Sequence, residues 1–144
     1  MQIYKEEREA LKDSILENSF LKYRDEPDKA IRAYLRYVLN IVNNHPIWRK
    51  VFIEKEHLEL KISRSSEEEI KRICRDNVET IIPFFEEWAD AGLLIDKPAK
   101  ILAETTQAVL SLIHFRNELE NDDFPEIMDI FIDLLAENIV KKKY

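Results

Sequence analysis

The sequence is nearly without glycine, since Gly92 is the only one in 144 residues. Nucleotide-binding fingerprints and phosphate-binding loops need several glycines, because only a residue without a side chain lets the backbone approach a phosphate closely. Tight β-hairpins also depend on turns that contain glycine. The composition therefore excludes the glycine-rich nucleotide-binding classes and predicts an all-α protein.

Cysteine and long apolar runs are scarce as well. Cys74 is the only cysteine, so the chain has no internal disulfide framework and a reducing compartment is the natural inference. The sequence contains neither a secretory signal nor an apolar run of about 20 residues, the length that a membrane-spanning helix needs. We therefore expect a cytoplasmic protein without a membrane partner.

Basic residues are outnumbered, with 22 Lys and Arg against 29 Asp and Glu and a net charge of −7. The only basic run is formed by Lys141, Lys142 and Lys143. Affinity for DNA comes largely from cations that neutralise phosphates. This chain alone is therefore not expected to bind DNA.

Apolar residues recur every three or four positions along most of the chain, which is the spacing of amphipathic helices. A chain of this length can bury a core as one domain, which we place at residues 1–144. We predict six helices, near residues 5–21, 25–44, 46–61, 65–92, 96–119 and 122–140. The helix at 65–92 is the longest, and we expect the others to pack around it.

Proline and glycine mark the predicted helix boundaries. Four of the five prolines stand at helix starts or their approaches: Pro27, Pro46, Pro98 and Pro125. Proline is tolerated there because the first N–H groups of a helix have no partner within the helix. Pro83 lies inside the helix at 65–92 and predicts a bend. Gly92 is expected to end that helix by adopting a left-handed backbone conformation.

The last two predicted helices are apolar on nearly every side. Such a helix must be covered all round, and two of them cannot both lie at the centre of a six-helix domain. We therefore predict that they are shared between two copies of the chain, as a four-helix bundle with two helices from each copy. The predicted interface residues are Leu102, Thr106, Leu110, Ile127, Ile130, Phe131 and Leu134.

Residues that carry enzyme chemistry are few. Glu54 and His57 are spaced as in one half of a di-iron carboxylate site, but that site needs a second such pair and the sequence has none. Cys74 stands among isoleucines, without the signature of an activated nucleophile. We therefore predict no enzyme, no catalytic residue, no metal and no cofactor. A metal-dependent oxidase is a further alternative, which elemental analysis for iron or manganese would test.

The aromatic residues suggest a cavity for a small molecule. Their large apolar surface with a few polar atoms is typical of pockets between helices. Asn77 falls on the apolar stripe of the helix at 65–92 and needs a neighbouring helix or a bound molecule as its partner. Ordinary core packing explains the same residues, so both interpretations stay open. The predicted ligand-binding residues are Tyr34, Tyr37, Trp48, Phe52, Asn77, Ile81, Phe85, Trp88 and His114.

Four short phrases, taken in their order, resemble one protein family. They are YKEEREAL at residues 4–11, EPDKA at 26–30, NNHP at 43–46, and WADAGLL at 88–94 followed by DKP at 96–98. The last phrase precedes a nearly uniformly apolar helix. Together they resemble the C-terminal ligand-binding and dimerisation domain of the TetR family of transcriptional repressors, over nearly all of the chain.

The resemblance implies a six-helix domain that encloses a small, partly apolar effector between its first five helices and forms a homodimer through its last two. Effector binding would move the helix at 5–21, to which family members attach a DNA-binding domain with a helix-turn-helix. That domain is absent from this chain, which we expect to be a fragment of a longer repressor rather than a regulator without a DNA-binding part. The alternative function is a helical adaptor that binds a different protein and no small ligand.

Overall fold

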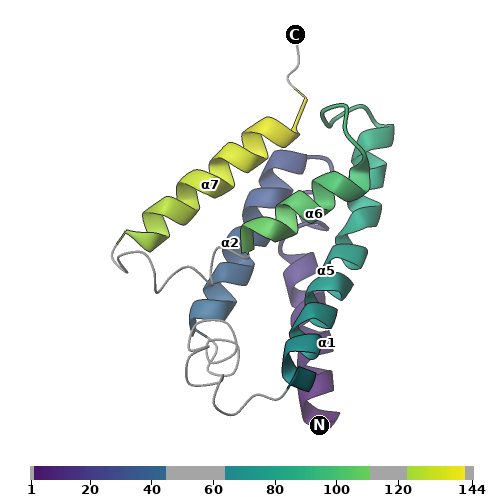
Figure 1. Ribbon diagram of the computed structural model, residues 1–144. Coiled ribbons are helices and arrows are strands. Elements are labelled where there is room, and N and C mark those ends of the chain that lie inside the picture. Colours follow the sequence, from purple (N-terminus) through teal and green to yellow (C-terminus); the bar gives the residue numbers. More distant parts are fainter. Residues whose placement is uncertain (1, 45–63, 111–122, 142–144) are drawn as a thin grey trace.

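The computed structural model describes residues 2–44, 64–110 and 123–141, and these residues form five α-helices (Figure 1). The helices are α1 (Gln2–Glu17), α2 (Pro27–Asn44), α5 (Arg64–Asp90), α6 (Ala99–Leu110) and α7 (Phe124–Ile139). Within the described residues there is no strand, only an isolated bridge between Leu94 and Val140. The all-α prediction is confirmed for these residues. The helix predicted at 46–61 and the second half of the one predicted at 96–119 lie outside them.

The helix starts follow the prolines. Pro27 is the first residue of α2, Pro98 immediately precedes α6, and Pro125 is the second residue of α7. At these positions the fixed φ of proline suits a helix, and its missing N–H leaves no broken hydrogen bond. The local chemistry of the chain therefore sets three of the five starts.

The helix α5 continues through Pro83, whose side chain is exposed, and ends in a left-handed turn at Gly92. Gly92 has a φ of 71°, as predicted from its place after the apolar pattern. The N–H of Leu93 donates to the carbonyl of Trp88 at 3.0 Å, and the N–H of Gly92 donates to the carbonyl of Ala89 at 3.0 Å. This pair of bonds is the Schellman motif, which satisfies carbonyls at the end of a helix.

Replacing Gly92 by alanine is expected to lower the free energy of unfolding by about 1 kcal/mol. A Cβ at this position would meet nothing within 4 Å, so the cost comes from the positive φ and not from a clash. Urea unfolding followed by circular dichroism would measure the loss. Gly92→Asn should lose less, because asparagine tolerates this conformation better. Equal stability of Gly92→Ala and the wild-type chain would contradict the prediction.

A short strap joins the end of α7 to the connector between α5 and α6. The N–H of Ile95 donates to the carbonyl of Ile139 at 2.9 Å, and the N–H of Lys141 donates to the carbonyl of Leu93 at 2.9 Å. These bonds flank the bridge between Leu94 and Val140. The strap therefore fixes the C-terminal end of α7 against the middle of the chain.

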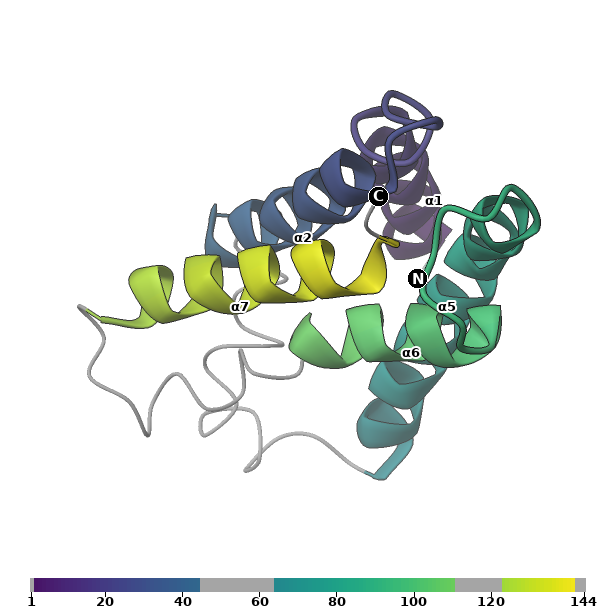
Figure 2. The ribbon, with the colours of Figure 1, turned by 90° about the horizontal axis from the view of Figure 1, so that it is seen from above.

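The helices pack around one hydrophobic core. The helix α6 packs against α5, and α7 packs against α2, with further contacts between α6 and both α2 and α7 (Figure 2). The core draws side chains from α2, α5, α6 and α7, from the turn after α1 and from the connector between α5 and α6. Its members are Phe20, Ala30, Ile31, Tyr34, Leu35, Ile81, Phe85, Trp88, Leu94, Leu102, Ala103, Leu110, Phe124, Met128, Ile132, Ala136 and Ile139.

Candidate functional site

Several of the predicted ligand-binding residues meet in a group of aromatic rings, here called the aromatic cluster: Phe20, Tyr34, Phe84, Phe85 and Trp88. The ring centroid of Phe20 lies 5.0 Å from that of Tyr34 and 5.1 Å from that of Phe84. It lies 5.5 Å from Trp88, and Phe85 and Trp88 are 5.2 Å apart. Such distances are typical of favourable aromatic pairs. Phe20 belongs to the turn after α1 and is the common neighbour of the other four rings.

Two polar atoms of the aromatic cluster bond within the chain. The indole Nε1 of Trp88 donates to the backbone carbonyl of Arg24 at 2.6 Å, which joins α5 to the turn before α2. The hydroxyl of Tyr34 donates to Oε1 of Gln107 at 2.7 Å, which joins α2 to α6. A buried indole or phenol needs such a partner, since burial without one costs about 1–3 kcal/mol. These bonds therefore hold the cluster between three helices.

Tyr37 links α2 to another neighbouring helix, α1. Its hydroxyl lies 2.7 Å from Oγ of Ser14, in a hydrogen bond that joins α2 to α1. The side chains of Tyr37 and Ser14 are both half-buried. Together, Tyr34 and Tyr37 therefore connect α2 to both α6 and α1.

The remaining predicted ligand-binding residues fall into two groups. Ile81 is buried in the core on α5, and Asn77, one turn earlier, is half-buried. Three others lie outside the described residues: Trp48, Phe52 and His114. The structure thus brings Tyr34, Ile81, Phe85 and Trp88 into one core, and their role as a ligand pocket stays a prediction.

The helix α7 has three distinct faces. Its buried face consists of Phe124, Met128, Ile132, Ala136 and Ile139. A second face carries Asp129, Asp133 and Glu137 and lies toward α2. The third, here called the apolar face of α7, consists of Ile130, Phe131 and Leu134, which are 54%, 45% and 52% exposed. All three residues were predicted to lie in an interface between copies.

The other predicted interface residues are less accessible. Ile127 is half-buried, and Leu102, Thr106 and Leu110 lie inside the core of the chain itself. The hydroxyl of Thr106 donates to the carbonyl of Leu102 at 2.9 Å, one turn earlier in α6. Because their own chain covers them, these three residues of α6 have little surface left for a second copy. Ile101 is a large apolar residue of α6 that is exposed.

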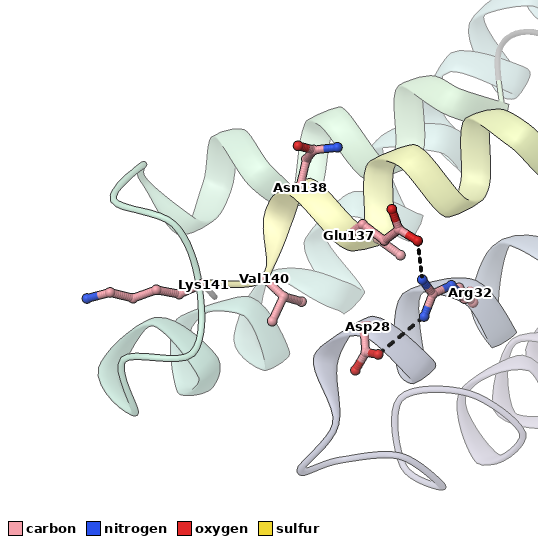
Figure 3. A pocket seen from close by; sticks show the side chains of 7 residues that line it. Asp28, Arg32, Glu137, Asn138, Val140 and Lys141 are labelled. Carbon is pink, nitrogen blue, oxygen red and sulfur yellow. Dashed lines mark hydrogen bonds and ion pairs between the residues drawn. The ribbon is translucent and has the colours of Figure 1, made fainter. Parts of the chain in front are cut away.

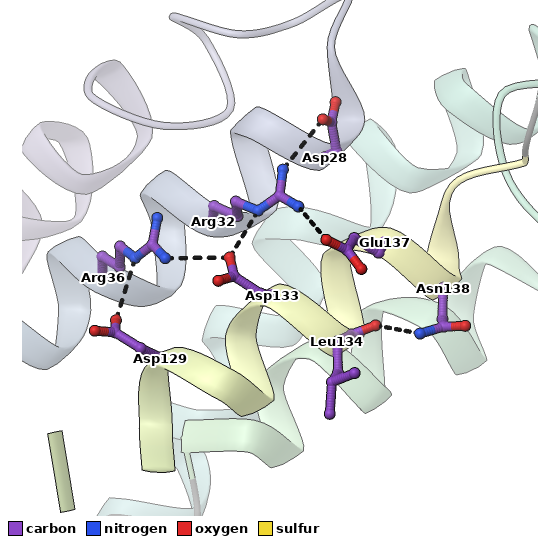
Figure 4. Close-up of polar contacts among 8 residues, drawn as sticks. All are labelled: Asp28, Arg32, Arg36, Asp129, Asp133, Leu134, Glu137 and Asn138. Carbon is purple, nitrogen blue, oxygen red and sulfur yellow. Dashed lines mark hydrogen bonds and ion pairs between the residues drawn. The ribbon is translucent and has the colours of Figure 1, made fainter. Parts of the chain in front are cut away.

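Two arginines of α2 bind the acidic face of α7, an arrangement here called the arginine ladder (Figure 4). Arg32 lies 3.0 Å from Asp133 and 3.6 Å from Glu137, measured between nitrogen and oxygen. Arg36 lies 3.2 Å from Asp133 and 3.5 Å from Asp129. Arg32 also pairs with Asp28 of its own helix, at 3.2 Å. Two cations of α2 therefore hold three carboxylates of α7.

A pocket of about 280 Å³ lies at one end of the arginine ladder, between the start of α2 and the end of α7 (Figure 3). Its lining residues are Asp28, Arg32, Ala136, Glu137, Asn138, Val140 and Lys141. The amide of Asn138 already donates to the carbonyl of Leu134 at 2.6 Å, and Arg32 is held by carboxylates. This lining is charged and lacks aromatic residues, so it differs from the predicted ligand pocket in both place and chemistry.

Two further observations apply to residues 2–44, 64–110 and 123–141. No three His, Cys, Asp or Glu side chains among them are placed to hold a metal ion. None of the helices that they form is both long and apolar enough to span a membrane.

No family model matches the chain, and no curated protein or solved structure matches it either. The resemblance to TetR-family regulators is therefore an interpretation of the sequence phrases.

Proposed function

We propose that the chain is the dimerisation and effector-sensing domain of a transcriptional repressor of the TetR type. The observation that carries the proposal is the apolar face of α7, which lies on the helix where the sequence resemblance expects a dimer interface. Three large apolar side chains, each about half exposed, form a patch that water solvates poorly. A second copy of the chain would cover it.

The position of α6 supports a four-helix arrangement. The helix α6 contacts α7 within the chain, and its exposed Ile101 offers a further apolar side chain. In a symmetric dimer the same patch meets itself, so α6 and α7 of one copy would lie against α6 and α7 of the other. The core face of α6 would stay within each copy.

The contacts of α2 supply a route for sensing. Tyr37 links α2 to α1 through Ser14, and Tyr34 links α2 to α6 through Gln107. A molecule that bound between these helices and preferred one arrangement of these contacts would shift the position of α1. In an intact repressor α1 would carry the DNA-binding domain. The aromatic cluster suits a small, partly apolar effector.

Native mass spectrometry at micromolar concentration tests both halves of the proposal. The expected result is the mass of two chains, with an added mass when a set of drugs, lipids and metabolites is offered. A monomer would contradict dimerisation and would favour the adaptor, which binds a different protein through the same face. A dimer that takes up none of the compounds would contradict sensing.

A further inference from the structure

The charges on and beside α7 do not balance. Its sequence, FPEIMDIFIDLLAENI, contains four acidic residues and no Lys or Arg. With the two residues that flank the helix and the ion-pair partners on α2, six carboxylates stand against three cations, which leaves a net charge of −3. The carboxylates are those of Asp28, Asp123, Glu126, Asp129, Asp133 and Glu137, and the cations are those of Arg32, Arg36 and Lys141.

The negative groups are more accessible than the cation that binds most of them. The side chains of Asp129 and Glu137 are each 64% exposed, and that of Asp133 is 48% exposed. Arg32 pairs with three carboxylates but is only 24% exposed, and Arg36 is 47% exposed. The arginine ladder therefore offsets part of the charge and leaves carboxylate oxygens open to a partner.

This charge lies along one edge of the apolar face of α7. Residues three apart are neighbours on a helix surface, so Asp133 adjoins Ile130, and Glu137 adjoins Leu134. Figure 4 shows Leu134 on the side of α7 that faces away from both arginines, so the ladder leaves the apolar face uncovered. The surface is therefore apolar along the helix and negative along the edge toward α2.

We infer that the apolar face of α7 also binds a basic amphipathic helix of a different protein, which competes there with the second copy. Such a helix would lay apolar residues three and four apart against Ile130, Phe131 and Leu134, and place Lys or Arg beside the negative edge. A second copy offers apolar contacts but brings a net charge of the same sign. The inference goes beyond the proposed function, since it names another occupant of the same face.

Two synthetic peptides test the inference. The first is a fluorescein-labelled amphipathic peptide of about 20 residues, with leucines on one face and lysines beside them, and the second has glutamate in place of each lysine. Fluorescence anisotropy measures their dissociation constants at about 20 mM and about 500 mM NaCl. We expect the wild-type chain to bind the lysine peptide about ten times more tightly than the glutamate peptide at low salt, and the difference to shrink at high salt.

A charge variant locates the negative edge. Glu126→Gln combined with Asp129→Asn removes two exposed carboxylates of α7 and should weaken binding of the lysine peptide about threefold at low salt. Glu79→Gln combined with Glu86→Gln is the matched control, because it removes two exposed carboxylates of α5 instead. The control should bind the peptide as the wild type does.

An apolar variant locates the face itself. Phe131→Ala should weaken binding of the lysine peptide about tenfold at both salt concentrations, because an apolar contact is not screened. Leu21→Ala truncates an exposed apolar residue of the turn after α1 and should leave binding unchanged. Circular dichroism of each variant confirms that it has folded.

Native mass spectrometry of the wild-type chain with the lysine peptide tests the competition. The expected species is one chain with one peptide. Equal binding of the two peptides, unchanged binding by either α7 variant, or a peptide bound to two chains would overturn the inference. The chain without peptide is measured alongside: a monomer there contradicts the proposed function alone, and the anisotropy measurements still decide the inference.

Discussion

Replacing Phe20 by alanine is expected to lower the free energy of unfolding by about 3–5 kcal/mol, the usual cost of removing a buried phenyl ring. Phe20 is fully buried, and its ring contacts those of Tyr34, Phe84 and Trp88. Its loss would open a cavity where the turn after α1 meets α2 and α5. Urea unfolding followed by circular dichroism would measure the change.

Leu21 provides the matched control for Phe20, because it is the next residue in the same turn and is 47% exposed. Leu21→Ala should change the free energy of unfolding by no more than about 0.5 kcal/mol. Similar losses for the two variants would show that Phe20 is not the centre of the aromatic cluster. They would also show that the aromatic cluster does not stabilise the packing of the turn after α1 against α5.

Replacing Phe131 by aspartate is expected to raise the dimer dissociation constant by about 100-fold, which corresponds to about 2.7 kcal/mol. Phe131 is the aromatic residue of the apolar face of α7, and in a symmetric dimer the change occurs twice. It would place an unpaired carboxylate in the interface between the two copies, beside the carboxylates already on α7. Light scattering coupled to size exclusion would follow the change.

A control of the same chemistry is available for Phe131. Leu21→Asp places a carboxylate at another exposed apolar residue, in the turn after α1 and away from α7. It should leave the dimer intact. A Phe131→Asp chain that dimerises as tightly as wild type would place the contact between copies somewhere else on the molecule.

The sequence predicts the local features of the fold well. The starts of α2, α6 and α7 follow from prolines, and the end of α5 follows from Gly92, because these residues act through their own φ angles. Apolar spacing identifies the same helices. These signals are local to each helix, so they do not depend on which helices pack against each other.

The sequence cannot tell which side of α6 is buried. Apolar residues occupy nearly every side of this helix, so the pattern gives no preferred direction. The apolar pattern predicts Leu102, Thr106 and Leu110 at the interface, yet they lie in the core, whereas Ile101 is exposed. The buried side is decided by α5, the preceding helix, which packs against one side of α6.

The aromatic cluster and the arginine ladder also depend on contacts between residues that are distant in sequence. Phe20 could be recognised as an apolar position, but its place among the rings of α2 and α5 depends on the turn after α1. Arg32 and Arg36 are four apart, as are Asp129 and Asp133, so each pair shares one helix face. Neither spacing shows that these two helix faces pack against each other. Arg32 and Asp133, which form a hydrogen bond, are 101 residues apart in the sequence.

The most direct test is an isotope-filtered nuclear Overhauser experiment on a mixture of methyl-labelled and unlabelled wild-type chains. It records only contacts between different copies. We expect signals from the methyl groups of Ile130 and Leu134 to protons of the unlabelled copy. Signals that come only from other residues, or no signal at millimolar concentration, would contradict the claim that a second copy covers α7.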